Sequence, residues 1–456
     1  MNAITLEQIA DWSGGALIQG SPNDAVTAVS TDSRTVSSSE LFVALKGDRF
    51  DAHDFLEGVA ERQAGAVLVH SLTSATEAFP GGIVHVKNTL SGLQGLARGY
   101  RKSLSGIRVV GLTGSNGKTS TKDFLAAVLS TGFSVNKTKG NLNNHIGVPL
   151  TILGSDSTHD FGIWEMGMNH SGEIEVLAEM AQPNVAVVTN IGTAHIENLE
   201  SREAIAEEKS QLPAMVPAEG YCVMPRDNDF FDFVSEQVQG DMVSIGFEKG
   251  DLRAENLHVS DSGKMSFDLV SEFADSFSIT LPVRGRHMVS NALLAAAVGF
   301  REGLTSEQVA EGLGSVELTG GRLEEKTIGG FAILDDSYNA NPDSMRAALT
   351  TLQESTVSGR RVAVLGFMGE LGHIEEEAHL TLGEEAVRLG VDILVTVGDK
   401  AARINQRAEE LAVNLNFSSH EEAAEFLRDE LTSGDLTLVK GSRGATMEKV
   451  IKGLVE

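Results

Sequence analysis

The segment 111–120, GLTGSNGKTS, constrains the possible folds more than any other part of the sequence. The apolar run before it, 108–114, is typical of a buried strand, and the amphipathic pattern that begins at Lys118 predicts a helix. Small residues join the two, so backbone N–H groups at the start of the helix are free to face an anion. The order of strand, glycine-rich turn and helix predicts an α/β unit that binds phosphate.

The spacing inside this turn differs from the common phosphate loop. The usual pattern G-x-x-x-x-G-K-[ST] requires a glycine six residues before the lysine, where this chain has Leu112. Glycine stands at Gly111 and Gly114 instead. Lys118 can still reach terminal phosphates, and the Thr119 hydroxyl can bind Mg²⁺. An ordinary glycine turn is the alternative, and the lysine and threonine that open the helix disfavour it.

From residue 108 onward, short apolar runs alternate with helical patterns. Continuous apolar strands that alternate with amphipathic helices indicate parallel sheets covered on both faces. Ligands are then expected at the carboxyl ends of the strands. The expected strands are residues 108–114, 161–166, 185–190, 221–225, 331–336, 361–366, 392–398 and 436–442.

The length of 456 residues suggests three domains at roughly 150 residues each. We expect a small α/β domain over 1–104 and a doubly wound α/β domain over 317–456. Between them, 105–316 should form a central parallel sheet of the P-loop type with helices on both faces. Within it, 241–283 alternates polar and apolar residues between turns, which predicts a small antiparallel insert.

Composition excludes several classes of function. The chain has 64 acidic and 36 basic residues, a net charge of −28, which disfavours binding to nucleic acid or to an anionic membrane. No apolar run approaches the roughly 18 residues of a membrane span, and the start of the chain has no signal-peptide pattern. The single cysteine, Cys222, lies in a strand-like run and is expected to be buried and inert. We expect a soluble, cytoplasmic protein, acting as a monomer.

The phosphate loop resembles the ATP loop of the Mur ligases, a family of bacterial cell-wall enzymes whose motif is TG-x-NGKT. The resemblance extends along nearly the whole chain, with further motifs in the expected order. It implies an ATP-dependent ligase that forms peptide bonds. The matching motifs are KGNLNNHIGVPLT (139–151), EMGMNHSGEI (165–174), TNIGTAHIENLES (189–201), GRHMVSNALLAAA (285–297), GGRLEEK (320–326), DDSYNANPDSM (335–345) and VKGSRGATMEKV (439–450).

One of these motifs is specific within the family. DDSYNANP resembles the branch whose substrates are UDP-N-acetylmuramoyl-tripeptide, D-alanyl-D-alanine and ATP. In the reaction that this implies, ATP phosphorylates a carboxylate to an acyl phosphate, and an amine attacks it through a tetrahedral intermediate. Positioned cations and metal ions must neutralise the phosphates and the developing charge.

The resemblance implies four catalytic residues: Lys118, Glu165, His195 and Lys209. Glu165 and His195 each follow an expected strand, although alone each could be an ordinary surface residue. Together with Thr119 they imply a site for two Mg²⁺ ions. By spacing alone, Lys209 is a helix-surface lysine. In the Mur ligases the matching lysine is carbamylated, and the resulting anion can hold a second metal ion.

The remaining site residues fall into groups that the resemblance assigns to different substrates. Asn291 could instead be a helix N-cap, and the motif 335–345 could be a cluster of turn-forming residues. The implied ATP contacts are Gly114, Ser115, Asn116, Gly117, Lys118, Thr119, Ser120, Asn291, Arg322 and Asp336. The implied substrate contacts are Thr31, Ser33, Arg34, Asp51 and His53 for the uridine nucleotide, Asn141, Asn143 and Asn144 for the sugar-peptide or the ATP loop, and Tyr338, Asn339, Asn341, Lys440 and Arg443 for the dipeptide.

Two positions depart from the family pattern. Ala52 replaces the glycine of a D-G-H sequence, so the local turn could differ. Phe367 replaces the acid of VLGDM, which argues against a polar role for that side chain.

Three other functions stay open at this point. A sibling ligase would add a diamino acid to a dipeptide precursor, and the motif DDSYNANP speaks against it. A folate polyglutamate ligase shares the ATP loop but would lack an N-terminal domain of the type that carries STDSR (30–34). A non-catalytic, nucleotide-gated binding protein would be expected to have lost part of the set Thr119, Glu165, His195 and Lys209.

Overall fold

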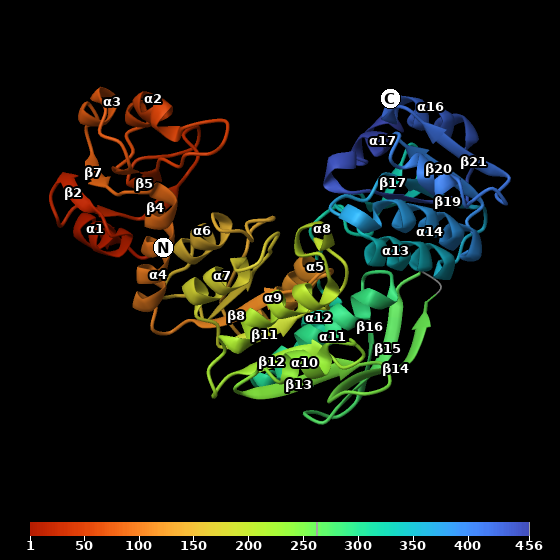
Figure 1. The fold of residues 1–456 in the computed structure, drawn as a ribbon. Coiled ribbons are helices and arrows are strands. Elements are labelled where there is room, and N and C mark those ends of the chain that lie inside the picture. Colours follow the sequence, from red (N-terminus) through yellow and green to blue (C-terminus); the bar gives the residue numbers. More distant parts are fainter. Residues whose placement is uncertain (261–262, 456) are drawn as a thin grey trace.

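The computed structural model describes residues 1–260 and 263–455. Figure 1 shows three α/β lobes in chain order, with the N-terminal lobe (red) and the C-terminal lobe (blue) on opposite sides of the central one (yellow to green). Each lobe has its own sheet, and most strand pairs are parallel, so the predicted fold class is confirmed. No helix in the described part of the chain is long and apolar enough to cross a membrane.

The N-terminal lobe has a five-stranded sheet in the order β2-β7-β6-β5-β4 and a separate β1-β3 pair. Helix α4 joins this lobe to the central one: Tyr100 donates a hydrogen bond to the carbonyl of Ser155 at 2.7 Å, and Arg101 donates one to the carbonyl of Ala181 at 2.8 Å. The elements are β1 (Ile4–Thr5), α1 (Leu6–Ser13), β2 (Ala16–Gln19), β3 (Ala25–Val26), β4 (Ala28–Ser30), β5 (Glu40–Val43), η1 (Ala52–Phe55), α2 (Leu56–Glu61), β6 (Ala66–Val69), α3 (Ser74–Glu77), β7 (Gly82–His85) and α4 (Thr89–Ser103).

The central lobe is a nine-stranded sheet in the order β16-β15-β14-β13-β12-β11-β8-β10-β9. The strands β8, β10 and β11 lie side by side in its parallel part, and each ends at the site described below. The elements are β8 (Arg108–Thr113), α5 (Lys118–Leu129), β9 (Val135–Lys137), α6 (Gly147–Leu153), β10 (Phe161–Glu165), α7 (Glu173–Ala181), β11 (Val185–Val188), α8 (Ile196–Leu199), α9 (Arg202–Ala214), β12 (Tyr221–Pro225), α10 (Phe231–Ser235), β13 (Asp241–Gly246), β14 (Leu252–Val259), β15 (Met265–Ser271), β16 (Phe277–Thr280), α11 (Arg286–Arg301) and α12 (Ser306–Gly314).

The predicted insert over 241–283 differs from the observed structure in one respect. β13 pairs in parallel with β12, and antiparallel pairing begins only between β14 and β15. The antiparallel strands therefore extend the edge of the central sheet. Their alternating sequence reflects an edge with one face buried, which also occurs at the end of a larger sheet. Residues 261–262 of this segment lie outside the described residues.

Helix α11 packs against α5, directly behind the phosphate loop. It begins at Arg286, so Asn291 lies within the helix and the N-cap alternative is wrong. The apolar and alanine-rich sequence allows most of this helix to be buried. Asn291 is consequently a buried polar residue, with 6% of its surface exposed, on a helix that faces the loop.

The C-terminal lobe has a six-stranded sheet in the order β17-β18-β22-β19-β20-β21. Only β17 is antiparallel to its neighbour. The elements are β17 (Glu324–Ile328), β18 (Phe331–Asp336), α13 (Pro342–Glu354), β19 (Arg361–Leu365), η2 (Gly372–Ile374), α14 (Glu375–Arg388), β20 (Ile393–Val397), α15 (Ala402–Asn405), β21 (Val413–Phe417), α16 (His420–Glu430), β22 (Leu436–Lys440), η3 (Arg443–Ala445) and α17 (Glu448–Gly453).

A buried carboxylate holds the start of two strands of this lobe together. Asp435 is 3% exposed and accepts hydrogen bonds from the backbone of Arg360 at 2.8 Å and of Thr432 at 2.9 Å. Burial alone would raise the pKa of Asp435, but these bonds and the Arg360 side chain lower it to about 2. The native state therefore holds this proton more weakly than the unfolded chain does. The resulting stability is present above about pH 4 and is lost as the pH falls toward 2.

We expect Asp435→Asn to destabilise the C-terminal lobe by about 2 kcal/mol at pH 7, from a pKa difference of roughly two units. The difference from wild type should shrink as the pH falls from 4 to 2. Urea unfolding followed by circular dichroism at several pH values measures both effects. Asp399→Asn is the control, because Asp399 is exposed. A loss of stability that is equal at pH 7 and pH 2.5 would contradict this account.

The predicted burial of Cys222 is confirmed. It lies in β12 with none of its surface exposed, and burial raises the pKa of its thiol to about 12. The thiol is therefore protonated and inert in the native protein.

Candidate active site

The phosphate loop depends on two glycines with left-handed backbones. Gly114 has φ 145°, and a Cβ there would lie 1.9 Å from the hydroxyl of Thr189. Gly117 has φ 76°, and a Cβ there would lie 2.7 Å from the amide oxygen of Asn291. These close approaches explain why the glycines stand where they do in the variant motif. Lys118 folds back over the loop and donates a hydrogen bond to the carbonyl of Gly114 at 2.6 Å.

The segment that follows β11 fixes the conformation of this loop. Asn190 accepts the backbone N–H of Ser115 on its carbonyl and that of Asn116 on its side-chain oxygen, both at 3.0 Å. Thr189 donates to the carbonyl of Asn116 at 2.5 Å. The sequence reasoning missed Thr189 and Asn190 as supports of the loop. The only signal for them was the TN pair at the end of an apolar strand.

Glu165 lies at the carboxyl end of β10, as expected, and is 1% exposed. It accepts hydrogen bonds from Thr119 at 3.0 Å and from the amide of Asn143 at 2.8 Å. Arg322 from the C-terminal lobe donates to the Thr119 hydroxyl at 2.9 Å. Four residues from separate motifs therefore meet at the start of α5. Ser120, also expected here, is buried in the first turn of α5.

Lys209 is on α9 and is 1% exposed, so it is not a helix-surface lysine. Its neighbour Glu208 is engaged elsewhere, because it accepts the backbone N–H groups of Gly172 at 2.7 Å and Ile174 at 2.8 Å. Within residues 1–260 and 263–455, no side chain or carbonyl forms a hydrogen bond or an ion pair with the Lys209 amine. Burial, assisted by the charge of Lys118, lowers the pKa of Lys209 well below its usual range. Burial therefore favours the neutral amine, which is the reactive form of lysine.

His195 follows β11 and has φ 67°, a left-handed conformation uncommon outside glycine. Its Nδ1 atom lies 2.6 Å from a carboxylate oxygen of Glu370 in the C-terminal lobe. That oxygen lies off the direction of the ring N–H, so the contact is close but is not an aligned hydrogen bond. Burial lowers the pKa of His195, Glu370 opposes this, and the charges of Lys118 and Lys209 add to the lowering.

The charge of Lys118 lowers the pKa of both His195 and Lys209, and the charge of Lys209 lowers that of His195, so the three side chains form one electrostatic neighbourhood. Glu165 opposes the lowering of the pKa of Lys118 and therefore belongs to it as well. A hydroxyl and a carboxylate are oxygen donors that fit Mg²⁺ bound with ATP, and the imidazole of His195 offers a nitrogen donor beside them. An unmodified, protonated Lys209 would repel such an ion, whereas a carbamate on the same nitrogen would bind it.

The motif 335–345 touches the phosphate loop directly. Asn341 is the N-cap of α13 and donates its side-chain N–H to Asn116 at 2.7 Å. The Arg322 guanidinium lies over the ring of Tyr338, 4.4 Å from its centre. This contact orients an arginine that already holds Thr119.

Two residues expected to bind the dipeptide, Lys440 and Arg443, form ion pairs with acidic side chains in this arrangement. Lys440 is 3% exposed, forms an ion pair with Asp336 at 2.6 Å and donates to the carbonyl of Asn339 at 3.0 Å. Arg443 forms an ion pair with Glu448 at 3.0 Å. Both cations are therefore paired in this arrangement, and their role in binding the dipeptide carboxylate stays a prediction. Asn339 holds this basic segment in place, because its carbonyl accepts from Lys440 and its side-chain oxygen accepts the backbone N–H of Arg443.

The expected N-terminal contacts lie far from the ATP loop. Arg34 is exposed and forms an ion pair with Asp32 at 2.7 Å, while Thr31 and Ser33 are partly exposed in the turn after β4. On the central lobe, Asn141 is exposed, and the Asn144 side chain accepts the backbone N–H of Gly147, the first residue of α6, at 2.9 Å. Of the three asparagines in this loop, Asn143 alone reaches the ATP site.

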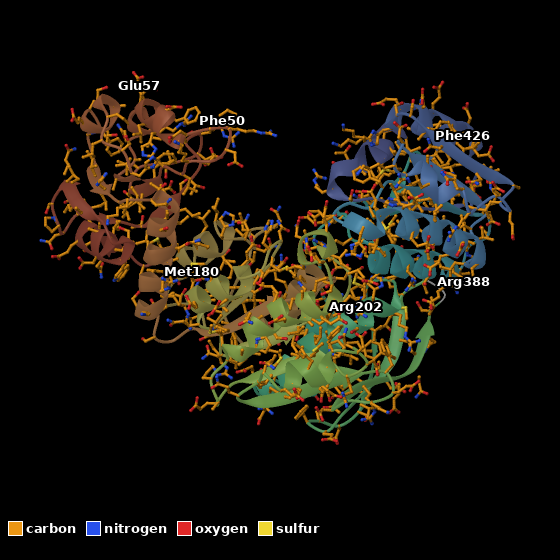
Figure 2. All side chains as sticks on the ribbon, in the orientation of Figure 1. Phe50, Glu57, Met180, Arg202, Arg388 and Phe426 are labelled. Carbon is orange, nitrogen blue, oxygen red and sulfur yellow. The ribbon has the colours of Figure 1, made fainter. Side chains whose placement is uncertain are left out.

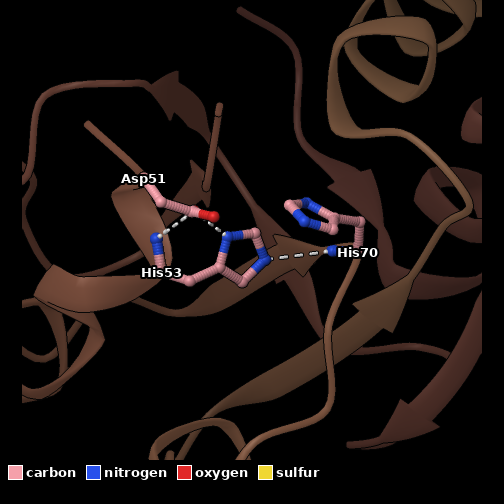
Figure 3. A group of neighbouring side chains, drawn as sticks. All are labelled: Asp51, His53 and His70. Atoms are coloured by element: carbon pink, nitrogen blue, oxygen red, sulfur yellow. Dashed lines mark hydrogen bonds and ion pairs between the residues drawn. The ribbon is translucent and has the colours of Figure 1, made fainter. Parts of the chain in front are cut away.

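Asp51 and His53 form a cluster with His70, shown in Figure 3. His53 Nδ1 lies 2.6 Å from Asp51, and its Nε2 accepts the backbone N–H of His70 at 3.1 Å. Both ring nitrogens are thus engaged, and the proton is on Nδ1. A metal ion on Nδ1 would move that proton to Nε2 and break the bond from His70, so the cluster does not fit a metal ion. Ala52 opens η1 without a positive φ, so replacing glycine leaves this turn unstrained.

Phe367, the other departure, packs rather than binds. The side chain of Lys400 lies over its ring at 5.6 Å, and a Cβ on Gly444 would lie 3.2 Å from the ring. The Phe367 carbonyl accepts the N–H of Ser442 at 3.0 Å, which ties this loop to the basic segment after β22.

Three family models match the chain in order: the Mur ligase family catalytic domain over 25–101, the Mur ligase middle domain over 112–299, and the Mur ligase glutamate ligase domain over 321–443. The chain belongs to the Mur ligase family.

Within that family its full-length relatives point to one member. The UDP-N-acetylmuramoyl-tripeptide–D-alanyl-D-alanine ligase of Bacillus subtilis is 36% identical over 458 residues, covering 99% of this chain and 98% of the relative. The crystal structure of MurF from Acinetobacter baumannii is 31% identical with a TM-score of 0.92, covering 100% of this chain and 99% of that one. MurF from Thermotoga maritima in complex with ADP is 29% identical with a TM-score of 0.84, covering 94% and 97%.

Proposed function

We propose that this protein joins D-alanyl-D-alanine to UDP-N-acetylmuramoyl-tripeptide, converting ATP to ADP and phosphate. The reaction class follows from membership of an ATP-dependent ligase family. The substrates are those named for the full-length relatives. The observation that carries the proposal is the contact of Asn341, within DDSYNANP, with Asn116 of the phosphate loop. It joins the motif specific to one branch of the family to the ATP site.

The chemistry is assigned to residues of this chain as follows. Lys118 neutralises charge on the terminal phosphate while the tripeptide carboxylate attacks it, giving an acyl phosphate and ADP. The amine of the dipeptide then attacks the acyl carbon and loses a proton. The C–O bond to the phosphate breaks, and inorganic phosphate leaves with that oxygen. Glu165, Thr119 and His195 would hold Mg²⁺, which supplies positive charge to the phosphate oxygens when bound.

Lys209 would complete a second Mg²⁺ site as a carbamate. Its neutral amine attacks CO₂, forming an N–C bond and releasing one proton, and the product is an anion. The support for this proposal is a fully buried lysine without a partner in the described residues, beside the other expected metal-binding groups. Burial that disfavours the ammonium favours both the neutral amine and its reaction.

The three lobes divide the substrates between them in this proposal. The N-terminal lobe, residues 1–104, would bind the UDP-sugar tripeptide through Thr31, Ser33 and Arg34. The central lobe, 105–316, would bind ATP, and the C-terminal lobe, 317–456, would present the dipeptide. Phe50, 73% exposed, projects from the N-terminal lobe (Figure 2). We further propose a cytoplasmic monomer, since each lobe contributes to a single site within one chain.

Phosphate release tests this function. Purified protein is given ATP and Mg²⁺ with UDP-N-acetylmuramoyl-tripeptide, with and without D-alanyl-D-alanine. Release that requires both substrates, with a pentapeptide product identified by mass, supports the proposal. Release only with a dipeptide precursor and a diamino acid would assign the sibling activity, and no release with any muramoyl substrate would indicate a non-catalytic protein.

A further inference from the structure

The C-terminal lobe holds the loop that carries His195. Asp343, in the first turn of α13, accepts hydrogen bonds from the backbone N–H of Thr193 at 3.0 Å and from its hydroxyl at 3.1 Å. The carbonyl of Glu370 accepts the N–H of Glu197 at 3.1 Å. The Glu370 carboxylate lies 2.6 Å from His195 Nδ1. The loop is therefore fixed on both sides of His195 by residues of another lobe.

The two residues that meet here both have strained backbones. His195 has φ 67° and Glu370 has φ 60°, and neither is a glycine. Such conformations are sparsely populated and persist only where surrounding contacts hold them. The turn also packs tightly, because a Cβ on Gly372 would lie 3.1 Å from the Cα of Glu197. The contact is therefore a specific fit between the two segments rather than a chance meeting of surface side chains.

The charge at this contact sets the chemistry of the imidazole. A lone pair on Nδ1 would face an anionic oxygen 2.6 Å away, so the proton is favoured on Nδ1 and the lone pair on Nε2. Carboxylates that contact the far nitrogen of a metal-binding histidine fix its tautomer and the orientation of its ring. The alignment of such contacts often improves when the ligand is bound.

We propose that Glu370 is a positioning residue that orients His195 toward the bound cation when the C-terminal lobe is docked. The inference rests on the metal-binding role of His195 in the proposed function. Docking of the lobe that presents the dipeptide then completes the ATP site of the central lobe. The cation site is complete only when the acceptor lobe is in place, so the acyl phosphate forms where the amine can reach it.

Replacing Glu370 leaves the core intact, because its side chain is 51% exposed. Glu370→Gln keeps the shape and removes the charge. Glu376→Gln is the matched control. Glu376 is exposed on α14, and the substitution removes the same charge from the same lobe. Within the described residues it forms no hydrogen bond or ion pair.

The test measures Mn²⁺ affinity by electron paramagnetic resonance in the presence of β,γ-methylene-ATP. We expect Glu370→Gln to bind Mn²⁺ roughly 10-fold or more weakly than wild type. Glu376→Gln should match wild type. In turnover, Glu370→Gln should lower kcat with little change in the KM for D-alanyl-D-alanine. Mn²⁺ affinity of Glu370→Gln within twofold of wild type would overturn the proposal.

His195→Ala separates this inference from the proposed function. If His195→Ala also binds Mn²⁺ as tightly as wild type, the metal role of His195 is wrong and the Glu370 proposal is overturned with it. If His195→Ala binds weakly and Glu370→Gln does not, only the Glu370 proposal is wrong. In the double variant, Glu370→Gln should add nothing to the loss caused by His195→Ala, because it acts through that ring. An additive loss would make Glu370 an independent ligand and contradict the positioning role.

Discussion

Lys209→Ala is expected to lower kcat by about 100- to 1,000-fold, the range seen when one preorganised group that stabilises transition-state charge is removed. The substitution removes the only nitrogen at this position that can carry a carbamate. Short carboxylates such as acetate should restore part of the activity by occupying the space that the side chain leaves. Steady-state phosphate release, with and without acetate, measures both effects.

Carbamylation itself is tested with ¹³C-bicarbonate. Wild-type protein should show a carbamate carbon signal by NMR that Lys209→Ala lacks. Lys102→Ala is the control, because Lys102 is an exposed lysine at the end of α4. It should retain both the signal and full activity. Wild-type kcat in Lys209→Ala would refute the role of this lysine, whatever the labelling shows.

Gly114→Ala should weaken nucleotide binding by roughly 100-fold or more. Gly114 has φ 145°, and the new Cβ would overlap the Thr189 hydroxyl at 1.9 Å. Strain and overlap together cost about 3 kcal/mol, which corresponds to roughly 100-fold in an equilibrium constant. The loop would have to move away from Thr189, and its N–H groups would no longer converge on the phosphates.

Calorimetric titration with ADP and Mg²⁺ measures this loss. Gly106→Ala is the matched control, since a Cβ at Gly106 meets nothing within 4 Å and should leave affinity unchanged. Thermal unfolding of each variant shows whether the lobe is intact. Affinity of Gly114→Ala within threefold of wild type would mean that the loop does not bind nucleotide in this conformation.

Much of the central site could be predicted from the sequence because its residues follow apolar strands of a parallel sheet. Lys118, Glu165 and His195 each occupy the carboxyl end of a strand or the loop beyond it, where the fold rule places ligands. Local patterns also predicted the helix that begins at Lys118 and the strand that carries Glu165, and the structure contains both. Periodicity and short-range order along the chain predicted where these residues lie, and the resemblance to the Mur ligases supplied their roles.

The rest depends on contacts between segments far apart in sequence. Nothing near Glu370 indicates that it meets His195, because they are 175 residues apart and belong to different lobes. Lys209 has the spacing of a surface lysine, and only the packing of α9 shows that it is buried. The pairing of Lys440 with Asp336 was not predicted, because the two residues lie on strands that are far apart in sequence. Burial and pairing of charges are tertiary properties that no local pattern encodes.

Oxygen atoms followed through the reaction show whether the tripeptide carboxylate is activated as an acyl phosphate. UDP-N-acetylmuramoyl-tripeptide labelled with ¹⁸O in its terminal carboxylate is incubated with the protein, ATP, Mg²⁺ and D-alanyl-D-alanine. An acyl-phosphate route transfers one ¹⁸O from the carboxylate to each phosphate released, because the C–O bond breaks when the amine attacks. With both carboxylate oxygens labelled, we predict phosphate that carries one ¹⁸O and a pentapeptide that keeps the other ¹⁸O in its new amide carbonyl. Phosphate without label, or label retained in full in the peptide, would contradict the account.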